Sequence, residues 1–213
     1  MDKHIIQDIN KWLESLKDNT IPSIKDMPEE GMYMEQLLAY LTSKLDPYTV
    51  DEDEKLITSY MVNNYVKGGV IPSPEKKKYN KEHLAYLLSI CLLKQVVSLD
   101  DISFILSLDA RDHKENHTTL YEMFKLYHDK EYASLAKDFH NDVEFARTRL
   151  NKKLGRATTE GKKEIYKEKT LLSLSYIAFR HAIVAEAHKT LATRLIKEVE
   201  EYYKDNDIKN FKK

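Results

Sequence analysis

Residues 60–79 read YMVNNYVKGGVIPSPEKKKY, a stretch in which two adjacent asparagines precede a glycine pair, two prolines and three lysines. A short helix is predicted over residues 59–67. Thr58 and Ser59 are both suitable N-caps for it, because a short hydroxyl side chain accepts a hydrogen bond from a free amide of the first turn. The stretch therefore begins as a capped helix of about two turns.

The second half of the stretch cannot continue that helix. Gly68 and Gly69 supply the left-handed stop that commonly ends a helix. Pro72 and Pro74 then exclude helical structure, so residues 70–79 are predicted to form an extended loop or a short β-ribbon. The lysines are thereby placed on a loop that leaves the helix abruptly.

Positive charge is concentrated around this stretch. Residues 1–54 contain five lysines against thirteen acidic side chains, whereas residues 55–94 contain seven lysines against two glutamates. The formal charge of the whole chain is only -1. A local basic segment is typical of a nucleic-acid-binding face, although many basic stretches are simply solvated surface.

The rest of the sequence favours an all-α protein of two units. The chain has 213 residues, 42% of them hydrophobic, with only five glycines and five prolines. Apolar residues recur at helical spacing through most of it. Residues 1–109 and 110–213 are predicted as the two units, with the acidic segment 51–54 as a loop, 110–116 as a linker, and Gly155 and Gly161 between two long helices. The helices expected besides 59–67 cover 4–17, 32–45, 81–96, 99–108, 117–153 and 161–204.

Several classes of protein are disfavoured. The first residues lack the apolar core of a signal peptide, and charges interrupt the longest apolar region at 170–199, so neither export nor a membrane span is expected. The single cysteine, Cys91, excludes an internal disulfide and fits a reducing cytoplasm. Cys91 is expected to be an inert core thiol; the alternative, a redox sensor, would need exposure and a lowered pKa.

The order of features from residue 57 to residue 108 resembles the winged helix-turn-helix head of MerR-type regulators. In that family a tyrosine-bearing recognition helix ends in a glycine, two aliphatic residues and a proline. The wing then closes on a basic residue, a tyrosine and a polar helix cap, and a later helix opens with serine and leucine. The corresponding residues here are Tyr65, Gly69, Val70, Ile71, Pro72, Lys77, Tyr79, Asn80, Ser98 and Leu99.

Two departures from the MerR pattern limit what the resemblance implies. Asn63 and Asn64 stand where an Arg-Tyr pair is usual, and the metal-binding cysteines are absent, so metal sensing is not implied. The segment MVNNYVKGGVIPSPEKKKYNKEHLAYL also looks like a bacterial family catalogued as a domain of unknown function, which includes YkrK-like proteins regarded as transcription regulators. This resemblance implies gene regulation by binding double-stranded DNA.

Residue chemistry supports the same expectation. An asparagine amide can make two hydrogen bonds to adenine in the major groove, and adjacent asparagines point about 100° apart on a helix, so one is expected to contact a base and the other a phosphate. Tyrosine hydroxyls and lysines are expected at phosphates. The alternative is a structural role for each: the asparagines form a solvated helix face, Lys76 to Lys78 form a solvated loop, and Tyr65 or Tyr79 packs in the core with its hydroxyl in water. The predicted DNA-contacting residues are Ser59, Tyr60, Asn63, Asn64, Tyr65, Lys67, Lys76, Lys77, Lys78 and Tyr79.

The last long helix has an apolar surface wider than one antiparallel partner needs, which predicts a homodimer. His181 and His188 lie two turns apart with Glu186 between them. They are interpreted as surface or interface polar residues, with a ligand or metal role left open because no third ligand is marked. A small-molecule effector between the two long helices is also left open.

Two other functional classes are alternatives to the regulator. A helical protein-interaction or adaptor module would use the basic loop on an acidic partner and would lack sequence-selective DNA binding. An enzyme is disfavoured, because the sequence contains no HExxH motif, nucleophile elbow, P-loop or dinucleotide fingerprint. No cofactor is expected.

Overall fold

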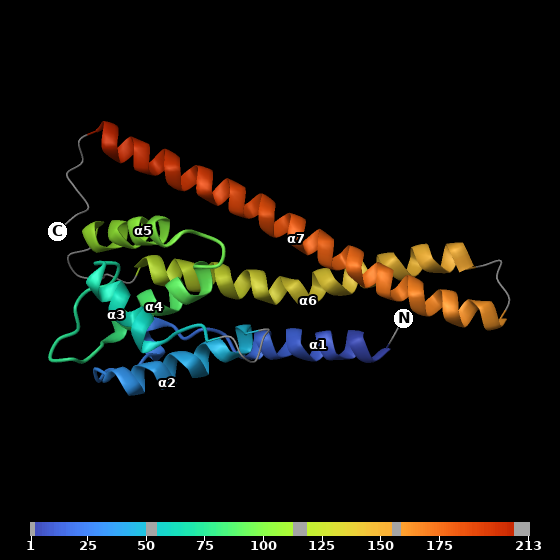
Figure 1. Cartoon of the computed structure of the whole chain (residues 1–213), viewed down its shortest axis with the longest axis horizontal. Coiled ribbons are helices and arrows are strands. Elements are labelled where there is room, and N and C mark those ends of the chain that lie inside the picture. The colour runs from blue at the N-terminus through green and yellow to red at the C-terminus, as the bar shows by residue number, and fades with distance from the viewer. Residues whose placement is uncertain (1–2, 50–54, 113–118, 155–158, 207–213) are drawn as a thin grey trace. The chain divides into compact units, whose positions relative to one another are not determined.

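The computed structural model describes residues 3–49, 55–112, 119–154 and 159–206. These residues form seven α-helices and two short 3-10 helices, and they contain no strand, which confirms the mainly helical prediction (Figure 1). The 3-10 helices are η1 (Ile24–Asp26) and η2 (Asp46–Tyr48). The α-helices are α1 (Lys3–Asp18), α2 (Met34–Leu45), α3 (Ser59–Lys67), α4 (Lys81–Leu93), α5 (Leu99–Asp112), α6 (Thr119–Leu154) and α7 (Thr159–Asp205).

Two boundaries that involve the long helices were predicted wrongly. Residues 110–112 belong to α5 and not to the predicted linker, whose remainder lies outside the described residues. Gly161 lies inside α7 and does not separate two helices. A single glycine costs a helix only about 1 kcal/mol, which a long helix tolerates. Gly155 and the acidic segment 51–54 are outside the described residues.

The start of α2 also differs from the prediction. Met32 was expected inside the helix, but its backbone pairs with that of Tyr79 in an antiparallel bridge. The helix begins two residues later, with Tyr33 as its N-cap and Gln36 accepting a hydrogen bond from the Tyr33 backbone N–H at 3.1 Å. A contact with a segment distant in sequence therefore sets this boundary.

The chain forms two compact units. Unit 1 comprises Met1–Asp18 and Asp129–His188, and unit 2 comprises Asn19–His128 and Lys189–Lys213. Unit 1 thus contains α1, most of α6 and the first part of α7, while unit 2 contains α2 to α5. The predicted domain boundary between residues 109 and 110 stays a prediction.

Unit 2 has a continuous apolar core centred on α4. Every side chain from His83 to Cys91 is buried, as expected of a helix that is packed on all sides. The buried face of α2 consists of Leu37, Leu41 and Leu45, and α2 packs against α4. The i, i+4 spacing of these leucines places them on one helical face.

Unit 1 is built from long helices with a narrower core. Phe139 and Val143 of α6 and Ile177 of α7 are buried, together with Leu13 and Leu16 of α1. No helix in the described part of the chain is both long enough and apolar enough to cross a bilayer.

Candidate nucleic-acid interface

Helix α3 begins at the predicted cap and buries one side. The Thr58 side chain accepts a hydrogen bond from the Met61 backbone N–H at 3.3 Å, so Thr58 and not Ser59 is the N-cap. Val62 and Tyr65, three residues apart, are the buried residues of the helix. This pair fixes which side of α3 faces the core.

The opposite side of α3 is polar and open to solvent. Tyr60, Asn63, Asn64 and Lys67 are all exposed, and Tyr60 is 73% exposed. Their spacing of three, four and seven residues places them on one face of the helix. Ser59 is exposed at the start of the same helix. We call Tyr60, Asn63, Asn64 and Lys67 the outward face of α3.

The glycine pair ends α3 in a Schellman motif. The Val70 backbone N–H donates to the Tyr65 carbonyl at 2.9 Å, and the Gly69 N–H donates to the Val66 carbonyl at 3.1 Å. Gly69 has a φ of 70°, a left-handed conformation that favours glycine. The predicted abrupt stop is therefore present, with Gly69 as its left-handed residue.

The lysines lie on a tight reverse turn. The Lys78 backbone N–H donates to the Glu75 carbonyl at 2.8 Å, and the two central residues, Lys76 and Lys77, have φ values of 49° and 64°. Positive φ at both central positions defines a type I′ turn, which usually contains Asn-Gly. All four side chains are exposed. We call residues 75–78 the lysine turn.

The lysine turn is held against the segment before α2. The backbones of Met32 and Tyr79 exchange two hydrogen bonds of 2.8 Å each. A side chain at Gly31 would place its Cβ 3.0 Å from the Cβ of Lys78, so only glycine fits there without movement. Lys78 Nζ lies 5.4 Å from the centroid of the exposed Tyr33 ring. Sequence reasoning missed Gly31 and Tyr33, because no local signal links them to residues more than 40 positions away.

Two of the predicted DNA-contacting residues lie in the core. Tyr65 is only 7% and Tyr79 only 4% exposed, and burial raises the pKa of each phenol. The Tyr79 ring meets the His83 ring edge-on at 5.3 Å. Packing accounts for both tyrosines, whereas the other eight predicted residues are exposed.

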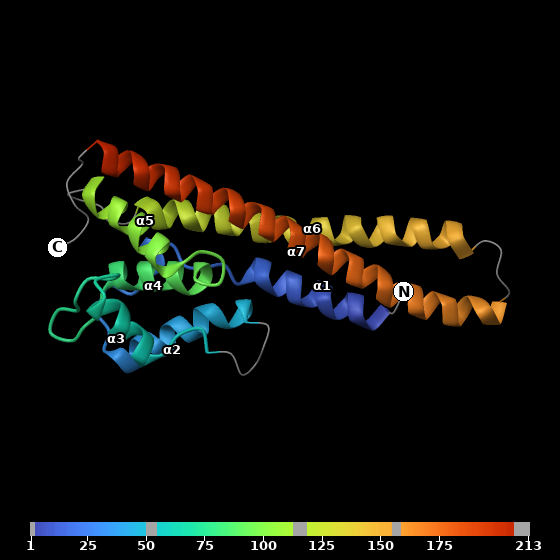
Figure 2. The same ribbon diagram turned by 45° about the horizontal axis from the view of Figure 1, so that its top comes forward.

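The exposed lysines differ in their surroundings. Among the described residues, the exposed Lys67, Lys76 and Lys77 have no carboxylate partner, whereas the half-buried Lys81 pairs with Glu29. The loop after α3 extends away from α2 and α4 in both views of the chain (Figures 1 and 2). Free ammonium groups on a projecting loop suit contact with an anionic polymer.

The predictions for Cys91, for a metal site and for His181 concern residues outside this surface. Cys91 is 1% exposed, and burial raises the pKa of its thiol to about 12, which confirms a core cysteine and contradicts a redox sensor. Within the described residues, no three His, Cys, Asp or Glu side chains are grouped to hold a metal ion. His181 lies 3.5 Å from Asp142 through Nε2.

The model of a domain of unknown function, DUF1836, matches residues 22–129 of the sequence. The protein is a member of the DUF1836 family. This match covers half of the chain and includes α3, the lysine turn and all ten predicted DNA-contacting residues. No curated protein and no solved structure matches the sequence. The DUF1836 region also coincides closely with the first segment of unit 2, Asn19–His128.

Proposed function

We propose that this DUF1836 protein is a DNA-binding transcription regulator whose head works like the MerR-type winged helix-turn-helix. The outward face of α3 enters the major groove, and the lysine turn acts as the wing and contacts the neighbouring phosphates. Helix α2 and α3 supply the helix-turn-helix pair. Double-stranded DNA is the partner.

The observation that carries this proposal is the backbone of the lysine turn. A non-glycine residue with left-handed backbone dihedrals costs about 1–2 kcal/mol of conformational energy. This turn has two lysines in that conformation, at positions where Asn-Gly would adopt it at lower cost. Neither side chain packs in the core, since both are exposed. Strained residues persist where function requires them, and the property that these two share is positive charge.

The roles of the remaining residues follow from exposure. Asn63 and Asn64 present amides at the centre of the outward face, where one can make a paired hydrogen bond to a base. Ser59, Tyr60 and Lys67 contact phosphates on either side and set the register of the helix. Tyr65 and Tyr79 act from the core by fixing α3 and the base of the turn.

A regulator of this kind binds two half-sites as a dimer, and α7 offers the surface. Phe179 and Ile183 are 67% and 66% exposed, and with Ala187 they form a row at four-residue spacing. The same spacing continues in the sequence at Leu191 and Leu195. Rows of this spacing are the ridges along which helices pack, so a second copy of the chain is the proposed partner.

The same exposed row supports a second candidate, a helical interaction module that binds another protein and not DNA. Exposed apolar side chains in a contiguous row are typical of protein contact sites. In that case the lysine turn would face an acidic partner, and any DNA binding would be weak, insensitive to sequence and lost as salt rises.

Selection of bound sequences from a random duplex pool at about 0.15 M salt separates the two candidates. The regulator is expected to enrich one motif, and a dimer would enrich an inverted repeat. An absence of enrichment, with only weak binding that disappears as salt rises, would favour the interaction module. Sedimentation of the wild type and of Ile183→Asp then tests the dimer, because a charge in an apolar interface disrupts it.

A further inference from the structure

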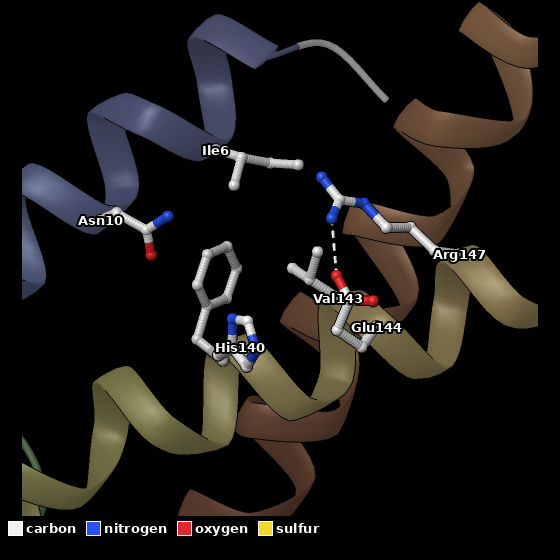
Figure 3. Close-up of a pocket in the computed structure, with 7 residues that line it drawn as sticks. Ile6, Asn10, His140, Val143, Glu144 and Arg147 are labelled. Carbon is white, nitrogen blue, oxygen red and sulfur yellow. Dashed lines mark hydrogen bonds and ion pairs between the residues drawn. The ribbon is translucent and has the colours of Figure 1, made fainter.

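Two cavities of different character lie among the described residues of unit 1. The smaller, about 110 Å³, lies between α1 and α6, where Ile6 and Asn10 face His140 and Val143 (Figure 3), and Phe139 also lines it. Arg147 and Glu144 pair with each other at 2.6 Å at its edge. A water molecule occupies about 30 Å³ of liquid, so this space suits a few waters and no organic ligand.

The larger cavity lies between α6 and α7 and measures about 730 Å³. Its volume is within the range of 300–1,000 Å³, roughly, that small-molecule sites occupy. We call it the α6–α7 cavity. Its lining comes entirely from unit 1, from residues 142–152 of α6 and 169–180 of α7.

Apolar and aromatic side chains form much of the lining. Phe145, Leu172 and Tyr176 are 63%, 50% and 64% exposed, while Ile177, which also lines the cavity, is buried. Exposure of two aromatic rings and a leucine to water at the wall of a cavity costs free energy. An apolar ligand would cover these side chains and remove that cost.

The charges around the same cavity are mostly positive. Arg149, Lys152 and Lys169 line it, and none of them has a carboxylate partner in the described part of the chain. Asp142, the carboxylate among the described lining residues, is already engaged by Arg180 at 2.8 Å and lies 3.5 Å from His181. An entering ligand therefore meets three cations that no described carboxylate compensates.

We infer that the α6–α7 cavity binds an amphipathic organic anion, with a carboxylate at Arg149 and the two lysines and an apolar chain over Phe145, Leu172 and Tyr176. The Arg149 guanidinium carbon lies 5.1 Å from the centroid of the Phe145 ring, which holds the planar group in place. Guanidinium matches a carboxylate with two parallel hydrogen bonds. A cationic ligand would meet like charges, and a neutral one would leave the three cations unused.

The inference does not depend on DNA binding, and its test uses the full chain without DNA. Dodecanoate, held below its micelle-forming concentration, is titrated against the protein by equilibrium dialysis, with dodecanol as the uncharged probe of equal length. Saturable binding of one dodecanoate per chain is expected, with dodecanol at least about tenfold weaker, because it lacks the charge-assisted hydrogen bonds.

Variants assign the binding to the cavity. Arg149→Gln combined with Lys169→Gln should weaken dodecanoate binding about tenfold or more and leave dodecanol binding unchanged. Leu172→Gln should weaken both probes, because it removes apolar contact. Lys137→Gln, which removes an exposed lysine of α6 outside the cavity, is the matched control and should bind like the wild type. Circular dichroism confirms that each variant is folded.

Three results would overturn the inference. Equal affinity for dodecanoate and dodecanol would remove the role of the cations. Unchanged dodecanoate binding in the Arg149 and Lys169 double variant would place the ligand elsewhere. Saturable binding that is absent from a dimer and appears only when dilution dissociates that dimer would show that a second chain and not a small anion covers this cavity.

Discussion

At the start of α4, the side chains of Asn80 and His83 each accept a hydrogen bond from the backbone N–H of the other residue. The Asn80 side-chain oxygen accepts a hydrogen bond from the His83 N–H at 3.3 Å, and His83 Nδ1 accepts one from the Asn80 N–H at 3.1 Å. This is a capping box with histidine in the place of the usual glutamate or glutamine. Because His83 is buried against Tyr79, the cap of α4 also supports the base of the lysine turn.

The first prediction concerns this cap. Asn80→Ala should lower the free energy of unfolding by about 1 kcal/mol, because the N–H of the buried His83 loses its acceptor. Urea denaturation followed by circular dichroism measures the change. Asn80→Ser, which keeps a capping oxygen, should recover most of the loss. An alanine variant as stable as the wild type would show that the cap contributes nothing.

The second prediction concerns the free energy of unfolding at acidic pH. Burial lowers the pKa of His83 below its ordinary value of 6.5, while Glu82, Glu75 and the Pro72 and Ser73 backbone act in the opposite direction. The unfolded chain therefore binds the proton more readily than the folded chain. The stability that His83 contributes is fully present above about pH 6.5 and is lost as the pH falls from there through the lower folded pKa.

Urea denaturation at pH 7.5 and pH 5.5 tests this dependence. His83→Gln is the control, since glutamine preserves the capping box but does not titrate. The loss of stability between the two pH values should be smaller in the variant than in the wild type. Equal losses would assign the acid sensitivity to other groups.

The third prediction separates strain from charge in the lysine turn. Replacing Lys76 with Asn and Lys77 with Gly should raise the free energy of unfolding by about 1 kcal/mol, because these residues adopt positive φ at lower cost. The same double variant should bind DNA more weakly, with a salt slope reduced by about two, since two phosphate contacts are lost. Denaturation and fluorescence anisotropy at several salt concentrations measure the two effects.

The arginine double variant, Lys76→Arg with Lys77→Arg, is the matched control for this turn. It retains both the charge and the backbone strain, so its stability and salt slope should equal those of the wild type. If the Asn-Gly variant keeps full affinity for DNA, the lysine turn does not contact phosphates.

The fourth prediction concerns the outward face of α3. Asn63→Ala or Asn64→Ala should lose about 1–3 kcal/mol of discrimination at a single base position of the selected motif. Lys67→Ala should instead weaken binding to all sequences and reduce the salt slope by about one. Lys130→Ala, at an exposed lysine of α6, should change neither. Equal losses on specific and random DNA for both asparagine variants would refute base reading.

The fifth prediction concerns Cys91. A thiol that is buried and has a pKa raised to about 12 is almost wholly protonated and out of contact with solvent. A disulfide reagent added to the native protein at pH 8 should react at the slow rate of unfolding. Full reaction within seconds is expected only in denaturant. Rapid modification of the native protein would contradict the core position.

The helix ends could be predicted from sequence because caps depend on neighbours within four residues. Thr58, Gly69, Asn80 and Ser98 act on amides or carbonyls of their own helix ends, and each terminates or begins a helix where the local pattern indicated. The mainly helical class followed in the same way from apolar spacing. These features need no information about the rest of the fold.

Tertiary packing decided which of the predicted site residues reach solvent. Tyr65 and Tyr79 looked like phosphate ligands in sequence, but core contacts with residues far along the chain bury them, since a phenol ring gains more from packing than from exposure. The bridge from Met32 to Tyr79, the close approach of Gly31 to Lys78 and the α6–α7 cavity likewise join segments distant in sequence. The sequence alone determined the helical class, the caps at Thr58, Gly69, Asn80 and Ser98, and the basic segment, because those depend on short-range hydrogen bonds and composition. The exposure of the outward face of α3, the position of the lysine turn against residues 31–33 and the α6–α7 cavity arose only when the folded chain brought remote residues into contact.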